Sequence, residues 1–112
     1  MYDMAFEPDV VYVKNNTLIE LQLINEGIDS LMIHNIIFVQ KGKADEIGVK
    51  ALRAGEANQY VPKHPAVIAA SKLVKPLDTA ELSFSAPPIG SYPYICSFPG
   101  HYLKMRGRLV VE

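Results

Sequence analysis

Short stretches in which every second residue is apolar dominate this sequence. In residues 19–23 the apolar Ile19, Leu21 and Leu23 are separated by polar residues, and residues 79–84 repeat the pattern. Successive side chains of a β-strand point to opposite faces, so this alternation predicts strands with one buried and one solvent-facing side. Further strands are expected at 10–14, 32–39, 67–74, 91–96 and 108–112. Many short strands separated by turn residues favour an all-β sandwich.

One segment departs from the two-residue period. Within residues 43–54, Ile47 and Ala51 recur at helical spacing, and Gly55 follows as a stop signal. The pair Asp45-Glu46 is expected in the first turn of this helix, where carboxylates interact favourably with the helix dipole. The sequence therefore predicts one short helix inserted between the strands of the sandwich.

Length and charge exclude several classes of protein. With 112 residues the chain has room for one hydrophobic core, and residues 1–112 are expected to form a single domain. The formal net charge is -1 and the basic residues are scattered, which argues against a nucleic-acid partner. No apolar run reaches the roughly 20 residues that span a membrane. A single cysteine cannot form a disulfide within the chain.

The stretch Cys96-Ser-Phe-Pro-Gly-His101-Tyr-Leu-Lys-Met105 places a thiol, an imidazole and a thioether close together. A second imidazole, that of His34, lies far upstream on a different expected strand. Two His and one Cys in a plane, with a weak axial Met, are the ligands of blue-copper electron-transfer sites. Sulfur ligands favour Cu(I) and imidazole accepts Cu(II). A ligand geometry intermediate between those preferred by the two oxidation states changes little when the copper gains or loses an electron. Pro99 and the glycine after it stiffen and turn the loop so that it can fold over a metal.

Zinc is the chief alternative metal for these side chains. Its structural sites usually have four Cys or His ligands, and only three are offered here. The remaining histidine, His64, lies in a polar loop and is interpreted as an exposed side chain.

With these residues in register, the chain resembles the azurin and auracyanin branch of the cupredoxins. Cys-x4-His-x3-Met is the loop spacing of that branch, and His34-Asn35 resembles its His-Asn pair. Residues 90–96 and 107–111 resemble the strand that leads into the cysteine and the closing strand. The likeness covers nearly the whole chain from about Phe6 onward. It implies the cupredoxin fold, a Greek-key β-sandwich with the short helix at about 43–54, and one copper ion as cofactor.

The resemblance also assigns roles around the copper. It implies that Asn35 ties the His34 segment to the Cys96 loop, and that the backbone N–H groups of Asn35 and Phe98 donate to the sulfur. Such outer contacts orient ligands and tune the reduction potential. The carbonyl of Ile33 falls where azurin places a weak fifth contact.

The start of the chain departs from the family pattern. The family's first strand is expected to be missing, because Met1 falls near where that strand should end, and the azurin disulfide is absent. The start Met-Tyr-Asp and the stretch Tyr60-Val-Pro62 resemble azurin-like domains fused into large bacterial dehydrogenase-like polypeptides. We therefore expect an excised domain from a periplasmic or other extracytoplasmic bacterial protein, with no signal peptide in this segment.

The expected function is one-electron transfer, between separate redox partners or inside a larger redox protein. Met32, Phe98, Pro99 and Leu103 are expected to surround His101 as an apolar docking patch, because transient redox partners bind through small interfaces. The expected partners are redox proteins such as c-type cytochromes, or a fused or partner dehydrogenase.

The sequence leaves two other functions to consider. Copper storage or delivery is the alternative, although such sites usually have exposed, exchange-prone ligands. Copper oxidases and nitrite reductases need further histidines for a second copper centre, and only His64 remains. The chain alone is therefore expected to be an electron carrier and not an enzyme.

Overall fold

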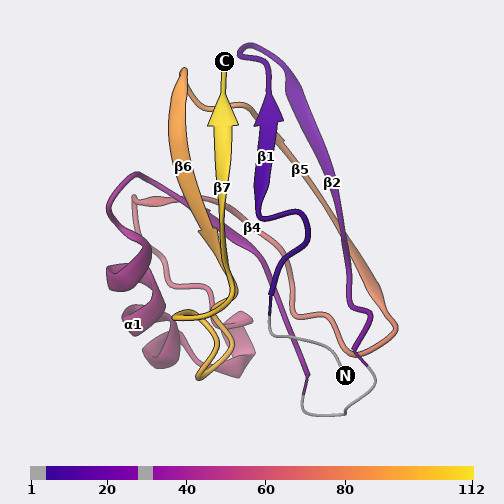
Figure 1. The fold of residues 1–112 in the computed structure, drawn as a ribbon. Helices are drawn as coiled ribbons and strands as arrows, with labels where there is room; N and C mark the ends of the chain where they lie inside the picture. Colours follow the sequence, from indigo (N-terminus) through magenta and orange to yellow (C-terminus); the bar gives the residue numbers. More distant parts are fainter. Residues whose placement is uncertain (1–4, 28–31) are drawn as a thin grey trace.

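Two β-sheets form a sandwich in the computed structural model, which describes residues 5–27 and 32–112 (Figure 1). The larger sheet has the order β1-β7-β6-β3-β4 and contains β1 (Val10–Val13), β3 (Ile37–Val39), β4 (Val67–Ala70), β6 (Gly90–Ile95) and β7 (Arg106–Val111). The smaller sheet pairs β2 (Leu18–Ile24) with β5 (Thr79–Ser85). One helix, α1 (Ala44–Ala54), and a 3₁₀ turn, η1 (Glu56–Asn58), lie between β3 and β4 in the chain. The expected all-β sandwich with one short inserted helix is confirmed.

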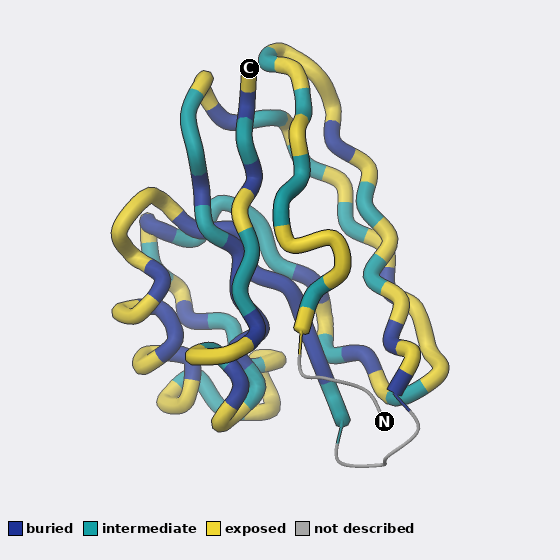
Figure 2. The backbone as a smooth tube through the Cα atoms, viewed as in Figure 1, coloured by how far each residue is buried: buried dark blue, intermediate teal, exposed yellow. Residues whose placement is uncertain are grey.

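The main core lies between the two sheets. Alternate residues of β6 and β7, among them Tyr92, Tyr94 and Leu109, point inward, and so do alternate apolar residues of β2 and β5. The apolar residues at the two ends of β2, Leu18 and Ile24, are exposed. The rings of Phe38 in β3 and Phe84 in β5 join the sheets, with centroids 4.8 Å apart. Along the strands, buried positions alternate with more exposed ones, as the two-residue period predicts (Figure 2).

Helix α1 covers the outer face of the larger sheet. Its buried residues are Ala44, Ile47, Gly48 and Ala51. Of these, Ala44 and Ile47 join a hydrophobic cluster that contains Ile95 of β6. Asp45 and Glu46 occupy the first helical turn, as expected from the sequence. The sheet is therefore buried on both faces near β3, which explains the apolar run in that strand.

The expected strand at 32–39 is wrong in its first half. Only residues 37–39 form β3, and His34 makes an isolated bridge with Val74, with backbone N···O distances of 3.1 and 2.6 Å. Between these points the Ile36 N–H donates to the side chain of Ser71. A side-chain acceptor thus interrupts the ladder, and β4 likewise ends before residue 74.

The position near Met1, where the missing first strand was expected to end, lies outside the described residues. Within the part of the chain that the structure describes, no helix is long and apolar enough to cross a membrane.

Candidate metal centre

The loop between β6 and β7 is a closed, internally bonded structure. At its base the N–H of Cys96 donates to the carbonyl of Met105 at 3.0 Å. Inside it, His101 donates to Phe98 at 3.0 Å and Met105 donates to His101 at 2.8 Å. Gly100 turns the chain with a φ of 86°, a conformation that glycine adopts without steric cost. These bonds fix the backbone of the loop that contains three of the expected ligands, Cys96, His101 and Met105.

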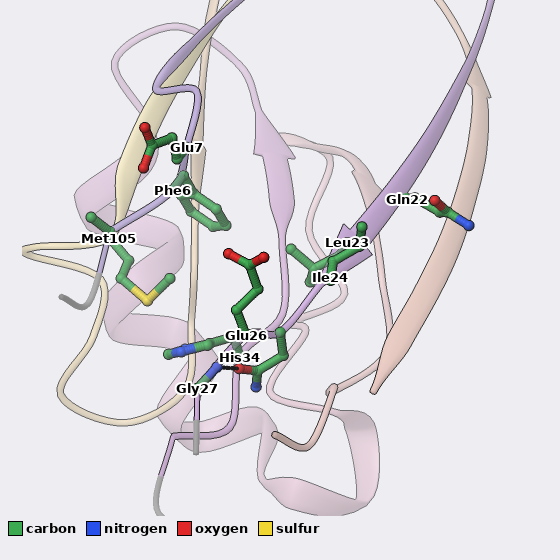
Figure 3. A pocket seen from close by; sticks show the side chains of 11 residues that line it. Phe6, Glu7, Gln22, Leu23, Ile24, Glu26, Gly27, His34 and Met105 are labelled. Atoms are coloured by element: carbon green, nitrogen blue, oxygen red, sulfur yellow. Dashed lines mark hydrogen bonds between the residues drawn. The ribbon is translucent and has the colours of Figure 1, made fainter. Parts of the chain in front are cut away.

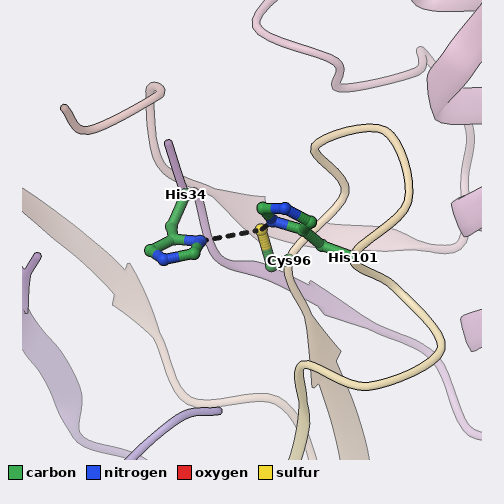
Figure 4. Close-up of side chains that lie close together, drawn as sticks. All are labelled: His34, Cys96 and His101. Carbon is green, nitrogen blue, oxygen red and sulfur yellow. Dashed lines mark hydrogen bonds between the residues drawn. The ribbon is translucent and has the colours of Figure 1, made fainter. Parts of the chain in front are cut away.

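Three of the four expected ligands meet at the end of this loop (Figure 4). The Sγ atom of Cys96 lies 3.8 Å from Nδ1 of His34 and 3.6 Å from Nδ1 of His101. The bridge to Val74 carries His34 to this point across 62 residues of sequence. No other group of three or more such ligand atoms occurs within residues 5–27 and 32–112.

The spacing of these atoms fits a metal ion. Distances of about 2.3 Å from metal to sulfur and about 2.0 Å to imidazole nitrogen are typical of first-row ions such as zinc. In a trigonal plane those bonds would separate sulfur and nitrogen by about 3.7 Å. A thiolate with two imidazoles is also the planar part of a copper electron-transfer site. The residues present therefore fit copper.

Met105 borders the same site from another side. Its side chain is buried, and with His34 it lines a cavity of about 510 Å³ (Figure 3). In that view the thioether sulfur of Met105 is directed toward His34. This placement is compatible with a weak axial ligand, and axial ligation by Met105 stays a prediction.

Burial sets the protonation states of the donor atoms. It raises the pKa of the Cys96 thiol to about 11, although backbone N–H groups of Asn35 and Phe98 act in the opposite direction by donating to the sulfur. Burial, with a smaller effect from His101, lowers the pKa of His34 to about 4, and burial also lowers the pKa of His101. At neutral pH the imidazoles are therefore neutral, as metal binding requires. The thiol is protonated until a bound cation displaces its proton.

Asn35 connects the two segments that carry the ligands. Its Oδ1 accepts from the Ser97 N–H at 2.8 Å, and its Nδ2 donates to Ser97 Oγ at 2.8 Å and to the Gln59 carbonyl at 3.0 Å. Ser97 Oγ in turn donates to the Tyr60 carbonyl at 2.6 Å. Gln59 and Tyr60 have φ values of 58° and 54°, a left-handed conformation that costs non-glycine residues roughly 1–2 kcal/mol each.

The sequence pattern did not single out Ser97, Gln59 and Tyr60 as residues around the site. The only available signal was a hydroxyl residue, Ser97, directly after the cysteine. Gln59 and Tyr60 contribute main-chain carbonyls, which the identity of a side chain does not reveal.

The residues expected to dock a partner differ in exposure. Leu103 is 71% exposed and Pro99 is also exposed, whereas Phe98 and Met32 are half-buried. The Phe98 ring lies 5.2 Å from the His101 ring, and His101 is 7% exposed, so only a small part of it meets solvent.

Two further residues that the sequence singled out, Ile33 and His64, are both half-buried. Ile33 is half-buried, and the contact expected from its carbonyl stays a prediction. His64, expected to be exposed, is half-buried, because its Nε2 lies 2.8 Å from a Glu46 carboxylate oxygen and its Nδ1 accepts from the Ala66 N–H. His64 is not part of the ligand group.

Comparison with known proteins agrees with this geometry. The model of the family described as copper binding proteins, plastocyanin/azurin family, matches residues 1–112. Auracyanin-A of Chloroflexus aurantiacus is 35% identical over 113 residues, which cover 98% of this chain and 68% of the relative. Auracyanin-B of the same organism is 29% identical over 114 residues, and the chain spans about half of its length, 47%. Azurin-1 of Alcaligenes xylosoxydans xylosoxydans is 32% identical over 84 residues, 71% of this chain and 65% of the relative.

Solved structures of similar proteins share the fold. The structure of auracyanin A, described as a "blue" copper protein, superposes with a TM-score of 0.90 and covers 98% of this chain and 90% of its own. Dithionite-reduced auracyanin from Roseiflexus castenholzii is 27% identical and also has a TM-score of 0.90, covering 98% of this chain and 89% of its own.

Proposed function

Because the chain belongs to the plastocyanin/azurin family of copper-binding proteins, we propose that His34, Cys96, His101 and Met105 hold its single copper ion. The protein functions in one-electron transfer through type 1 copper and is an electron carrier rather than an enzyme. The observation that carries the ligand assignment is the approach of two imidazole Nδ1 atoms to within 3.6 and 3.8 Å of one sulfur.

A bound copper ion would supply a one-electron Cu(I)/Cu(II) couple. The chain would hold its ligands in nearly fixed positions during that change. Asn35 and Phe98 N–H groups orient the Cys96 sulfur, and burial keeps both imidazoles neutral and ready to bind. The backbone bonds of the loop keep His101 and Met105 in place. A site that moves little on oxidation has a low reorganisation barrier, which suits rapid electron transfer.

The electron would leave and enter near His101. In this proposal Pro99 and Leu103, both exposed, form an apolar docking patch with the half-buried Met32 and Phe98. The patch is small and carries no charge of its own, so a redox partner could bind briefly and dissociate quickly.

Redox proteins are the partners of such a carrier. We propose c-type cytochromes, or a dehydrogenase fused to or associated with this domain, in a periplasmic or other extracytoplasmic location. The fused arrangement is supported by the resemblance of Tyr60-Val-Pro62 to azurin-like domains in bacterial dehydrogenase-like polypeptides. Residues 1–112 would then be one cupredoxin domain of a larger protein.

Two measurements on the copper-loaded protein distinguish a carrier of electrons from a carrier of copper. NMR line broadening in mixtures of oxidised and reduced protein gives the electron self-exchange rate, which should be fast. A competing chelator for Cu(I) should remove the metal only slowly, because the proposed ligands are buried. Slow self-exchange together with rapid loss of copper would overturn the electron-transfer function in favour of copper delivery.

A further inference from the structure

Helix α1 touches the ligand loop at a glycine. The ring of Tyr102, the residue after His101, lies directly against Gly48, which is buried in the helix. A Cβ atom added at Gly48 would lie 2.4 Å from both Cγ and Cδ2 of Tyr102. Ordinary contacts between carbon atoms are about 3.5–4.0 Å, so no larger residue fits while the ring stays in place.

The contact between Gly48 and Tyr102 involves Cγ, the atom through which the ring is attached to the rest of the side chain. Rotation of the Tyr102 ring about its own axis leaves Cγ where it is, so the ring cannot turn away from an added Cβ. Either the whole side chain leaves its rotamer or the loop backbone moves away from the helix. Glycine in the middle of a helix destabilises that helix by about 1 kcal/mol relative to alanine. Gly48 therefore lowers the stability of α1 at the point where the loop contacts it.

Arg106 makes a second connection between the same two elements. Its Nε donates to the Tyr102 carbonyl at 2.7 Å, and its guanidinium forms an ion pair with Asp45 in the first turn of α1. The guanidinium carbon also lies 5.8 Å from the centroid of the Tyr102 ring, within the range of a cation–π contact. One side chain thus bonds to the loop backbone, the loop ring and the helix.

The two contacts hold both ends of the segment that carries two proposed ligands. Tyr102 directly follows His101, and Arg106 directly follows Met105. We propose that Gly48, Tyr102, Arg106 and Asp45 form a loop clamp, which positions His101 and Met105 by holding their loop on α1. These four are positioning residues, because they act on copper only through the loop. The effect on copper rests on the proposed ligand set, whereas the clamp itself can be tested without metal.

The first test uses hydrogen exchange in the copper-free protein. The Lys104 and Met105 amides both donate to the His101 carbonyl, so their exchange reports whether the loop is closed. Gly48→Ala should speed the exchange of these amides at least tenfold, although alanine favours the helix. Val49→Ala, on the exposed side of α1, is the control and should leave the loop amides unchanged. Unchanged exchange in Gly48→Ala would overturn the clamp without touching the ligand assignment.

A double variant shows whether Gly48 acts through Tyr102. Without the ring, a methyl group at position 48 no longer meets Cγ or Cδ2. The loop exchange of Gly48→Ala/Tyr102→Ala should therefore equal that of Tyr102→Ala alone. If the effects of the two single substitutions on loop exchange add up in the double variant, Gly48 acts on the loop independently of Tyr102. That result would overturn the proposal.

Arg106 provides a test that does not depend on Gly48→Ala folding. Arg106→Gln should loosen the loop in the copper-free protein. After Cu(II) is added it should also shift the visible absorption band and lower the self-exchange rate severalfold. Arg108→Gln removes the same charge two residues further along β7, from an exposed side chain, and should change none of these. Equal effects of the two variants would show that charge, and not a clamp, is responsible, and would overturn the inference.

Discussion

Asn35 and Ser97 are joined by two hydrogen bonds, although 62 residues separate them in the sequence. The Asn35 side chain accepts from the Ser97 N–H and donates to its hydroxyl, both at 2.8 Å. Asn35 adjoins His34 and Ser97 adjoins Cys96, so the pair fixes the distance between two proposed ligands. A change at Ser97 is therefore expected to reach the metal centre.

The first prediction concerns this pair. Ser97→Ala removes the hydroxyl that accepts from Asn35 and donates to the Tyr60 carbonyl. Because these groups are largely buried, the free energy of unfolding of the copper-free protein should fall by about 1–3 kcal/mol. Chemical denaturation measures it, with Ser85→Ala at the exposed end of β5 as control. A loss no greater than that of the control would mean that the pair contributes little.

The second prediction concerns the reduction potential. The axial ligand tunes the potential of type 1 copper sites. Met105→Leu removes a donor that favours Cu(II) and should raise the midpoint potential, whereas Met105→Gln offers an oxygen donor and should lower it. Cyclic voltammetry measures both. An unchanged potential in both variants would show that Met105 does not face the copper.

The third prediction concerns partner contact. Leu103→Glu should leave the visible spectrum unchanged, since Leu103 is 71% exposed and is not a proposed ligand. The self-exchange rate should fall severalfold, because two patches could meet only by bringing like charges together. Ile89→Glu, at a side chain that is 66% exposed and directly precedes β6, should have little effect. NMR line broadening compares the variants, and an equal fall in both would place docking elsewhere.

The fourth prediction concerns pH in the copper-free protein. The His34 imidazole has a pKa of about 4 in the fold, through burial and then His101, against 6.5 in the unfolded chain. Between these values the unfolded chain binds a proton that the folded protein does not. The stability that is present above pH 6.5 is therefore lost as the pH falls toward 4.

Melting temperatures measure this effect. Between about pH 7.5 and about pH 5 the parent should lose more stability than His34→Gln, which cannot titrate at this position. Burial lowers the pKa of His101 too, so His34→Gln should retain part of the dependence. Identical pH dependence in parent and variant would contradict the burial of a neutral His34.

The sequence was informative where structure depends on side-chain pattern. Residues 19–23 and 79–84 have the two-residue period of strands that are buried on one face, and they lie within β2 and β5. The pattern could not show where a ladder stops. The Ser71 N–H donates to the Ile36 carbonyl as in a strand, but the Ile36 N–H donates to the Ser71 hydroxyl, and this bond depends on a residue 35 positions away.

Pro93 illustrates the same limit. A proline inside a strand pattern favours an edge or a bulge. In the structure β6 is an internal strand, but its ladder with β3 includes Tyr94 and Ile95 and stops before Pro93, where the missing N–H would be needed. The types of the proposed ligands and their spacing in the loop could be predicted from the sequence. The Gly48–Tyr102 contact could not, because it depends on how α1 packs against the loop between β6 and β7.

The visible absorption of the protein after addition of Cu(II) tests the central claim most directly. A thiolate bound to Cu(II) in the proposed site should give an intense charge-transfer band. Cys96→Ser removes the sulfur with little change of volume and should abolish the band, while a control such as Ser85→Ala keeps it. A colourless copper-loaded parent, or an intact band in Cys96→Ser, would contradict the copper–thiolate site.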